Sequence, residues 1–173
     1  MHVTRKLAVL AMILFAAPSA MAAVYSTPTR DVENPDRAPY LEYKSGSISP
    51  PFVNTFMYFP TPNGSRVVIE YVTLSCTTPS ATDTMTQVAL VVTKQLSSSS
   101  STSFSAANIP MQRVGPAFFG GYAWEGSMLI KTYSDPQLGT ADGGQGIYLN
   151  IFHTESSQTV SCAGSLSGHL FTP

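Results

Sequence analysis

Charged side chains are scarce in this sequence, because only 11% of its 173 residues are Asp, Glu, Lys or Arg, less than half of the about 25% typical of soluble proteins. The nine Lys and Arg residues are scattered singly, which excludes the basic stripe that nucleic-acid binding requires. Disorder requires low hydrophobicity and a high net charge, whereas 43% of the residues are hydrophobic and the net charge is −1. The length predicts one folded domain.

The N-terminus has the pattern of a secretory signal peptide over residues 1–22. Arg5 and Lys6 provide the positive start, and Leu7–Ala17 is an apolar core of eleven residues. Ala20-Met21-Ala22 is a small-x-small cleavage site. The apolar core is shorter than the about 20 residues that a membrane-spanning helix needs, and no later segment reaches that length. We therefore expect an exported protein, periplasmic or extracellular, with no membrane span after the signal is removed; a retained membrane anchor is the alternative.

Cysteine is almost absent, with Cys76 and Cys162 as the two examples. Because exported proteins fold in an oxidising compartment, these two predict one disulfide. It would close a loop of roughly 86 residues, for which the chain-entropy model gives about 4–5 kcal/mol of stabilisation. Two buried free thiols are the alternative. No CxxC pair and no Cys/His cluster predicts a metal site, and we expect no cofactor.

The remaining chain shows short apolar runs of period two, broken by Gly, Pro, Asn and Ser, which is typical of β-strands. We expect residues 23–39 to form an extended N-terminal arm and residues 40–173 an all-β domain. The predicted strands are 40–44, 52–59, 66–76, 85–95, 127–133, 147–155 and 159–171, with weaker candidates at 109–114 and 118–122. We expect the Ser/Thr tract 97–103 and the glycine-rich segment 134–146 to be loops.

Both faces of the predicted strand 66–76 are apolar, because Val67 and Ile69 alternate with Val68 and Val72. This indicates a central strand that is covered on both sides. Two antiparallel sheets with seven to nine strands in total, packed face to face and joined by the Cys76–Cys162 bridge, satisfy the pattern. We therefore predict a two-sheet antiparallel β-sandwich, of which a jelly roll is one form. A closed barrel is the alternative.

The last two predicted strands fit a hairpin that turns at residues 155–158. One face of this hairpin is mostly apolar, and the other is far more polar, so a slip by one residue would mix the two sets. The apolar face consists of Ile147, Leu149, Ile151 and His153, lying opposite Leu166, Gly164, Cys162 and Val160.

Candidate catalytic residues are few. His153 and Glu155 stand two positions apart on a predicted strand, so they point to the same face. They would act as a base and its orienting partner, or hold a metal ion, in a hydrolase or metal-dependent enzyme; a solvated strand end is the alternative. Glu70 lies in the most apolar strand, where it is a functional acid, half of an ion pair with Arg66 or Arg113, or a side chain that points to a strand edge.

The other polar residues give weaker evidence for a catalytic or metal-binding site. His169 has no acidic neighbour in the sequence, and no GxSxG motif marks a hydrolase nucleophile. Asp135, Asp142 and Gly143-Gly144 offer oxygen ligands for Ca²⁺, but their spacing fits no EF-hand, and a flexible loop is the alternative. The inventory therefore favours a protein that is not an enzyme, with no assigned catalytic or metal-binding residue.

The predicted ligand-binding site is an aromatic segment that surrounds Gly120-Gly121. Aromatic rings on loops give a large contact area at low entropic cost and commonly bind sugars or partner surfaces. Ordinary sandwich core is the alternative. The segment contains Phe118, Phe119, Tyr122 and Trp124.

Two motifs lie between Val32 and Cys76. The first is Val32-Glu33-Asn34-Pro35, followed by Arg37 and Pro39-Tyr40, and the second runs from Phe59 through Pro62, Gly64 and Arg66 to Val72. They resemble the VENP-type arm and the VPAG-R-VIE-V-type hairpin of uncharacterised exported bacterial β-sandwich proteins, although Asn63 stands where a small residue is usual. The match covers about a quarter of the chain and includes no catalytic residue. The resemblance implies a small exported bacterial β-sandwich with no assigned activity.

These observations favour non-enzymatic recognition of a glycan, an envelope component or a protein surface. One alternative is the enzyme that would use His153 and nearby carboxylates. Another is a structural subunit of a surface assembly, in which an edge strand or the N-terminal arm adds to a neighbour's sheet.

Overall fold

The computed structural model describes residues 37–97, 100–117, 120–136 and 146–171. The expected signal peptide and most of the expected arm lie outside these ranges. In the described parts of the chain, no helix is long and apolar enough to cross a membrane. The described residues form nine strands: β1 (Arg37–Ile48), β2 (Asn54–Phe59), β3 (Arg66–Thr78), β4 (Met85–Ser97), β5 (Ser100–Asn108), β6 (Gln112–Pro116), β7 (Tyr122–Ser134), β8 (Ile147–His153) and β9 (Val160–Phe171).

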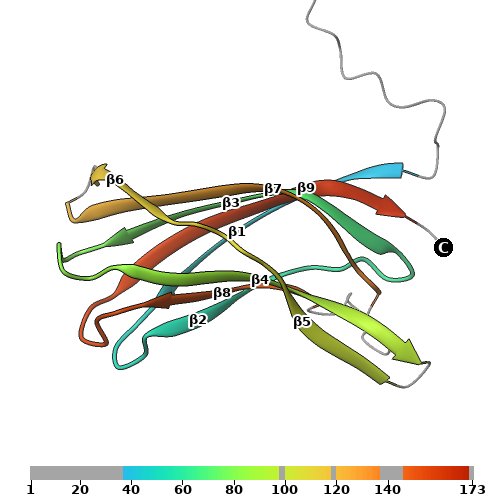
Figure 1. The fold of residues 1–173 in the computed structure, drawn as a ribbon, viewed down its shortest axis with the longest axis horizontal. Helices are drawn as coiled ribbons and strands as arrows, with labels where there is room; N and C mark the ends of the chain where they lie inside the picture. The colour runs from blue at the N-terminus through green and yellow to red at the C-terminus, as the bar shows by residue number, and fades with distance from the viewer. Residues whose placement is uncertain (1–36, 98–99, 118–119, 137–145, 172–173) are drawn as a thin grey trace, which may run out of the picture. The chain divides into compact units, whose positions relative to one another are not determined.

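The strands form two antiparallel sheets that lie one above the other (Figure 1). The five-stranded sheet has the order β1-β9-β3-β7-β6, and the four-stranded sheet has the order β2-β8-β4-β5. The antiparallel pairs β1–β9, β2–β8, β3–β7 and β4–β5 are nested in the sequence and alternate between the two sheets. This is the jelly-roll arrangement. The predicted all-β sandwich is therefore confirmed, and the closed barrel is not the arrangement found.

The core lies between the sheets and is built from alternate residues of each strand. Burying one such aliphatic or aromatic side chain stabilises the fold by roughly 1.5–3 kcal/mol. The fully buried side chains include Val67, Ile69, Val72, Leu74 and Leu166 of the five-stranded sheet and Phe59, Leu90, Ile147, Leu149 and Ile151 of the four-stranded sheet.

A β-bulge at Glu70 divides β3 into two parts. The register of β3 with both β7 and β9 shifts between Ile69 and Tyr71. Because the bulge adds one residue, Ile69 before it and Val72 after it both point into the core. The expectation that this strand is covered on both faces is therefore wrong: one face is buried, and the other is open to solvent.

The predicted disulfide joins Cys76 and Cys162. The two residues stand opposite one another on β3 and β9, which are neighbours in the five-stranded sheet. The pairing is thus confirmed, whereas the expected position between the two sheets is wrong. Both side chains still point into the core, so the bridge lies on the inner face of a single sheet.

The hairpin expected between the last two strands is also wrong. β8 pairs with β2 and β4, while β9 pairs with β1 and β3 in the other sheet. The predicted division into faces is nevertheless correct, because Ile147, Leu149 and Ile151 are buried on one side of the core and Val160 and Leu166 on the other. The segment between the strands crosses from sheet to sheet, so the two apolar faces meet across the core.

Two boundaries differ from expectation. Part of the Ser/Thr tract expected to be a loop belongs to β5, an edge strand that pairs with β4 and packs Phe104 against the core. β1 begins at Arg37, inside the expected arm, and runs for 12 residues along β9. A serine-rich segment can form a strand because backbone pairing and one inward aromatic ring suffice to fix an edge.

Candidate functional site: a groove lined by hydroxyl groups

The outer face of the five-stranded sheet is lined by small polar side chains. Strand alternation sends every second residue outward, and on the three central strands most of these positions hold Ser, Thr or Ala. The outward residues at the centre of the sheet are Ala163, Ser165 and Ser167 of β9, Tyr71, Thr73, Ser75 and Thr77 of β3, and Ala123, Glu125, Ser127 and Leu129 of β7.

A groove of about 610 Å³ lies over this face. Small side chains form its floor, where the hydroxyls of Thr73 and Ser165 are 2.7 Å apart. Larger side chains stand around it, including those of Tyr43, a residue that is 65% exposed, and Tyr71. We call this the hydroxyl groove and define it by Tyr43, Tyr71, Thr73, Ser75, Gln112, Val114, Glu125, Ser127 and Ser165.

One wall of the hydroxyl groove depends on a glycine. The segment before β6 passes so close to β7 that a Cβ atom on Gly126 would lie 2.7 Å from the backbone oxygen of Pro110. Such an approach is possible only without a side chain at this position. Gly126 therefore lets Pro110 and the adjoining strand β6, which carries Val114, border the groove.

The groove has the chemistry of a binding surface. A hydroxyl group both donates and accepts hydrogen bonds, and a tyrosine offers an apolar ring with a polar tip. Glu125 is the one charged residue among those that line the hydroxyl groove. In the described parts of the chain, no three His, Cys, Asp or Glu side chains cluster as metal ligands. The groove is thus suited to hold an uncharged ligand rich in hydroxyls.

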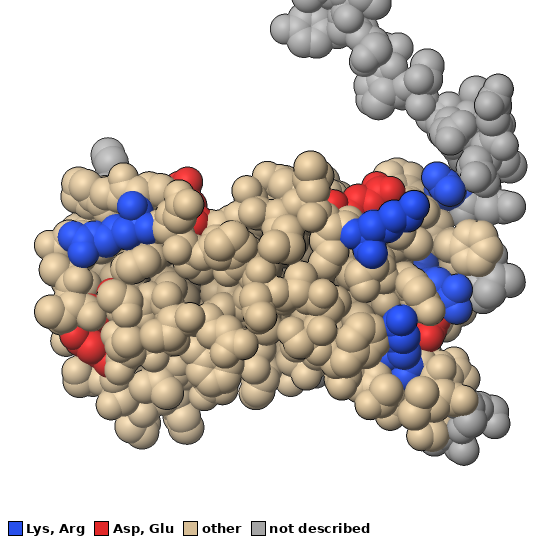
Figure 2. All heavy atoms as spheres, in the orientation of Figure 1, with Lys and Arg blue, Asp and Glu red and all other residues tan. Residues whose placement is uncertain are grey.

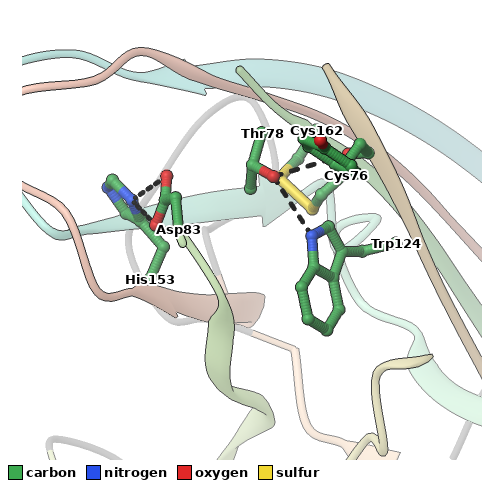
Figure 3. Close-up of a disulfide and its surroundings, with 7 residues drawn as sticks. Cys76, Thr78, Asp83, Trp124, His153 and Cys162 are labelled. Atoms are coloured by element: carbon green, nitrogen blue, oxygen red, sulfur yellow. Dashed lines mark hydrogen bonds and ion pairs between the residues drawn. A yellow bond between two sulfur atoms is a disulfide. The ribbon is translucent and has the colours of Figure 1, made fainter. Parts of the chain in front are cut away.

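The aromatic segment predicted to bind a ligand is distributed differently. Phe118 and Phe119 lie outside the described residues. Tyr122 lies beneath Arg113, whose guanidinium carbon is 4.0 Å from the ring centre. Trp124 packs against the core, and its indole nitrogen donates a hydrogen bond of 3.2 Å to Thr78, next to the disulfide (Figure 3). These contacts favour a structural role for Trp124.

His153 is buried, so the solvated strand end considered for it is wrong. Its Nδ1 lies 3.0 Å from each carboxylate oxygen of Asp83, and its Nε2 lies 3.3 Å from the backbone oxygen of Phe52 (Figure 3). Both ring nitrogens are therefore engaged inside the protein. The Glu155 side chain does not meet the ring but accepts a hydrogen bond from the hydroxyl of Thr82.

Glu70 and His169 lie together on the outer face. The bulge exposes Glu70, and its Oε1 is 3.3 Å from Nδ1 of His169. The expected partners Arg66 and Arg113 are thus both wrong. His169 has an acidic neighbour after all, because β9 pairs with β3 over a long sequence separation that local spacing does not reveal.

Of the acidic residues considered for a Ca²⁺ site, Asp135 is the one that the structure describes, and it makes other contacts. Asp135 accepts hydrogen bonds from Nε of Arg66 at 2.8 Å and from the backbone nitrogen of Gln95 at 3.0 Å. It therefore ties the end of β7 to β3 and β4. Asp142 and Gly143-Gly144 lie outside the described residues.

A second exposed feature lies on the four-stranded sheet. The rings of Phe56, Tyr58 and Tyr148 contact one another with centre-to-centre distances of 5.3–6.2 Å. These rings are tilted or edge-on to one another. They form a patch that is distinct from the hydroxyl groove on the opposite sheet.

Sequence reasoning missed the residues of the hydroxyl groove. The signal was present in part, because the last strand alternates Ser161, Ala163 and Ser165 on its polar face. The strands that complete the groove, its neighbours β1 and β3 and then β7 beyond β3, could not be identified without the sheet order. Comparison of the chain with protein-family models, with curated proteins and with solved structures found no match.

Proposed function

We propose that this is an exported recognition protein without enzymatic activity, which holds an uncharged, hydroxyl-rich stretch of a glycan in the hydroxyl groove. The observation that carries the proposal is the floor of serine and threonine hydroxyls flanked by the exposed rings of Tyr43 and Tyr71. Sugar hydroxyls match side-chain hydroxyls as donors and acceptors, and the apolar faces of sugar rings pack against tyrosine rings. The disulfide is compatible with export.

A glycan fits the position of the groove better than a peptide strand does. Peptides commonly bind sheets by pairing with an unpaired edge, but the floor strands β9 and β3 each have a partner on both sides. Their backbone groups are already hydrogen-bonded, so recognition must use side chains. Lectin domains use the jelly-roll architecture, an analogy of fold alone.

The two rival functions have less support. A hydrolase that uses His153 would need an accessible ring nitrogen, whereas both nitrogens face protein acceptors. A subunit that assembles by strand addition at β1 would need an edge strand that is open to pairing with another chain. The alternation that buries Tyr40 and Ile48 also turns Glu42 and Lys44 inward, and inward charges on an edge strand discourage pairing with another chain.

Binding to a glycan array, followed by titration of the strongest glycan, tests the proposal. Tyr43→Ala and Ser127→Trp should each weaken binding about tenfold or more, the first by removing a ring and the second by filling the groove. Tyr58→Ala is the matched control, since it removes an exposed tyrosine from the other sheet. Urea unfolding confirms that each variant remains folded. Equal losses in Tyr43→Ala and Tyr58→Ala, or no bound glycan, would overturn the proposal.

A further inference from the structure

A second hollow, of about 340 Å³, lies on the same outer face of the five-stranded sheet. Unlike the hydroxyl groove, it is surrounded by charged side chains. We call it the charged pocket and define it by Arg37, Arg66, Glu70, Lys131, Tyr133 and His169.

Strand pairing explains why the basic residues meet there. On β9, Phe171 stands opposite Arg37 of β1 on one side and opposite Arg66 of β3 on the other. Lys131 comes from β7, which pairs with the far side of β3. Figure 2, which views the two sheets from the side, shows several Lys and Arg side chains toward the end of the molecule where β1 begins and β9 ends in Figure 1.

Two of the pocket's polar side chains are held in place by the protein. Arg66 is bound through Nε to Asp135 at 2.8 Å, and its guanidinium carbon lies 4.5 Å from the ring centre of Tyr133. His169 is held by Glu70 at 3.3 Å. These contacts leave the other guanidinium nitrogens of Arg66 without an acidic partner in the described chain. A positioned guanidinium of this kind is suited to binding a carboxylate or another oxyanion.

The pocket has an excess of positive charge. Among the described residues, no carboxylate pairs with Arg37 or Lys131. Glu70 is the one acid that lines the pocket, and Asp135 offsets the charge of Arg66 from beside it, so Arg37 and Lys131 carry the excess. A hollow surrounded by basic side chains attracts anions and raises their local concentration.

The charged pocket and the hydroxyl groove lie along the same strands. Ser165 borders the groove and His169 the pocket, four residues apart on β9, which is about 14 Å along an antiparallel strand. Ser127 and Lys131 repeat this spacing on β7. One chain-like ligand can therefore extend from one hollow into the other.

We infer that the ligand is an acidic glycan, whose neutral hydroxyls occupy the hydroxyl groove and whose carboxylate or sulfate group enters the charged pocket between Arg37, Arg66 and Lys131. This inference rests on the proposed function, since it takes the groove to be the glycan site. It adds the class of glycan and predicts that binding depends on ionic strength.

The test is titration of the whole exported protein with paired probes. The acidic probes are oligogalacturonate and dextran sulfate, and their neutral counterparts are carboxyl-reduced oligogalacturonate and dextran. At least one acidic probe should bind about tenfold more tightly than its counterpart, and Lys131→Gln and Arg37→Gln should each reduce that affinity by about the same factor. Which acidic probe binds distinguishes a carboxylate from a sulfate.

Lys44→Gln is the matched control, because it removes the same charge from β1 outside the charged pocket and should leave affinity within twofold or so of the wild type. Equal binding of acidic and neutral probes, unchanged in Lys131→Gln, would overturn the acidic-ligand inference and leave the groove proposal standing. Binding of free galacturonate as tightly as its oligomer would show a site for small anions only and would also overturn the inference. Binding of no probe would overturn both proposals.

Discussion

Cys76 and Cys162 face each other across the antiparallel pair β3–β9, so a bridge between residues 86 positions apart lies within one sheet. Their Cα atoms are 4.1 Å apart, close to the about 4.5 Å of opposed residues that exchange no backbone hydrogen bonds. The bridge therefore fixes the register of the strands whose outward side chains form the floor of the hydroxyl groove.

Removing the bridge should lower stability strongly. We expect the double variant Cys76→Ala, Cys162→Ala to lose up to about 4–5 kcal/mol of unfolding free energy, because the unfolded chain regains the freedom of the closed loop. Urea unfolding of the purified protein, with and without reductant, measures the effect. A wild type that reductant leaves unchanged in stability, while its mass rises by two hydrogens, would show that the bridge contributes nothing.

The buried pair of Asp83 and His153 should contribute more than an exposed pair of the same kind. Asp83 also accepts hydrogen bonds from the backbone nitrogens of Thr154 and Glu155. Asp83→Asn replaces one carboxylate oxygen with an NH₂ group, so the buried His153 ring and these backbone donors lose part of their acceptor. We expect a loss of about 3–5 kcal/mol in urea unfolding. Glu70→Gln is the matched control, because Glu70 also pairs with a histidine but its side chain is 54% exposed. Exposed pairs contribute about 0–1 kcal/mol to stability. Similar losses in both variants would contradict this ranking.

Alkaline conditions should destabilise the fold through Tyr40. Burial, followed by the nearby charge of Glu42, raises the pKa of the Tyr40 hydroxyl well above its ordinary value of 10.0, and the neutral hydroxyl donates a hydrogen bond of 2.8 Å to Pro60. The unfolded chain loses this proton near pH 10, whereas the folded chain retains it. The stabilisation is therefore complete below about pH 10 and is lost as the pH rises above it.

Urea unfolding between about pH 8 and pH 11.5 tests the contribution of Tyr40. Tyr40→Phe should be less stable than the wild type at neutral pH, because it lacks the hydrogen bond, but should show a shallower alkaline decline. Tyr43→Phe, which alters an exposed tyrosine on the same strand, should decline as the wild type does. Parallel declines in the wild type and Tyr40→Phe would show that another group is responsible.

Sequence alternation predicted which side chains face the core better than it predicted which strands are neighbours. Ile151 and Val160 were expected on one apolar face, and both are buried. Their strands nevertheless lie in different sheets, because the segment between them passes from one sheet to the other and is held by hydrogen bonds to Asp83. The alternation of apolar and polar residues along a strand determines which side chains face the core. The path of the connecting loop depends instead on contacts between residues that are distant in sequence.

The candidate site was harder to predict for the same reason. Tyr43, Tyr71 and Ser165 come from three strands that only the sheet order brings together. The bulge at Glu70 also shifted the alternation, so that an apolar strand was expected to be covered on both faces. Aromatic density along the chain indicated Trp124 instead, which packs against the core.

The bulge also gives a sharp test of the β3–β9 pairing at Gly168. A Cβ atom on Gly168 would overlap the backbone oxygen of Val68, next to Glu70, so Gly168→Ala must displace one strand at the bulge. We expect a loss of about 1–3 kcal/mol in urea unfolding, as for other overpacked sites. Gly46→Ala is the control, because a Cβ there meets no atom within 4 Å and should change stability by less than about 0.5 kcal/mol. If both alanine variants unfold at the wild-type urea concentration, β9 does not approach β3 as closely as described.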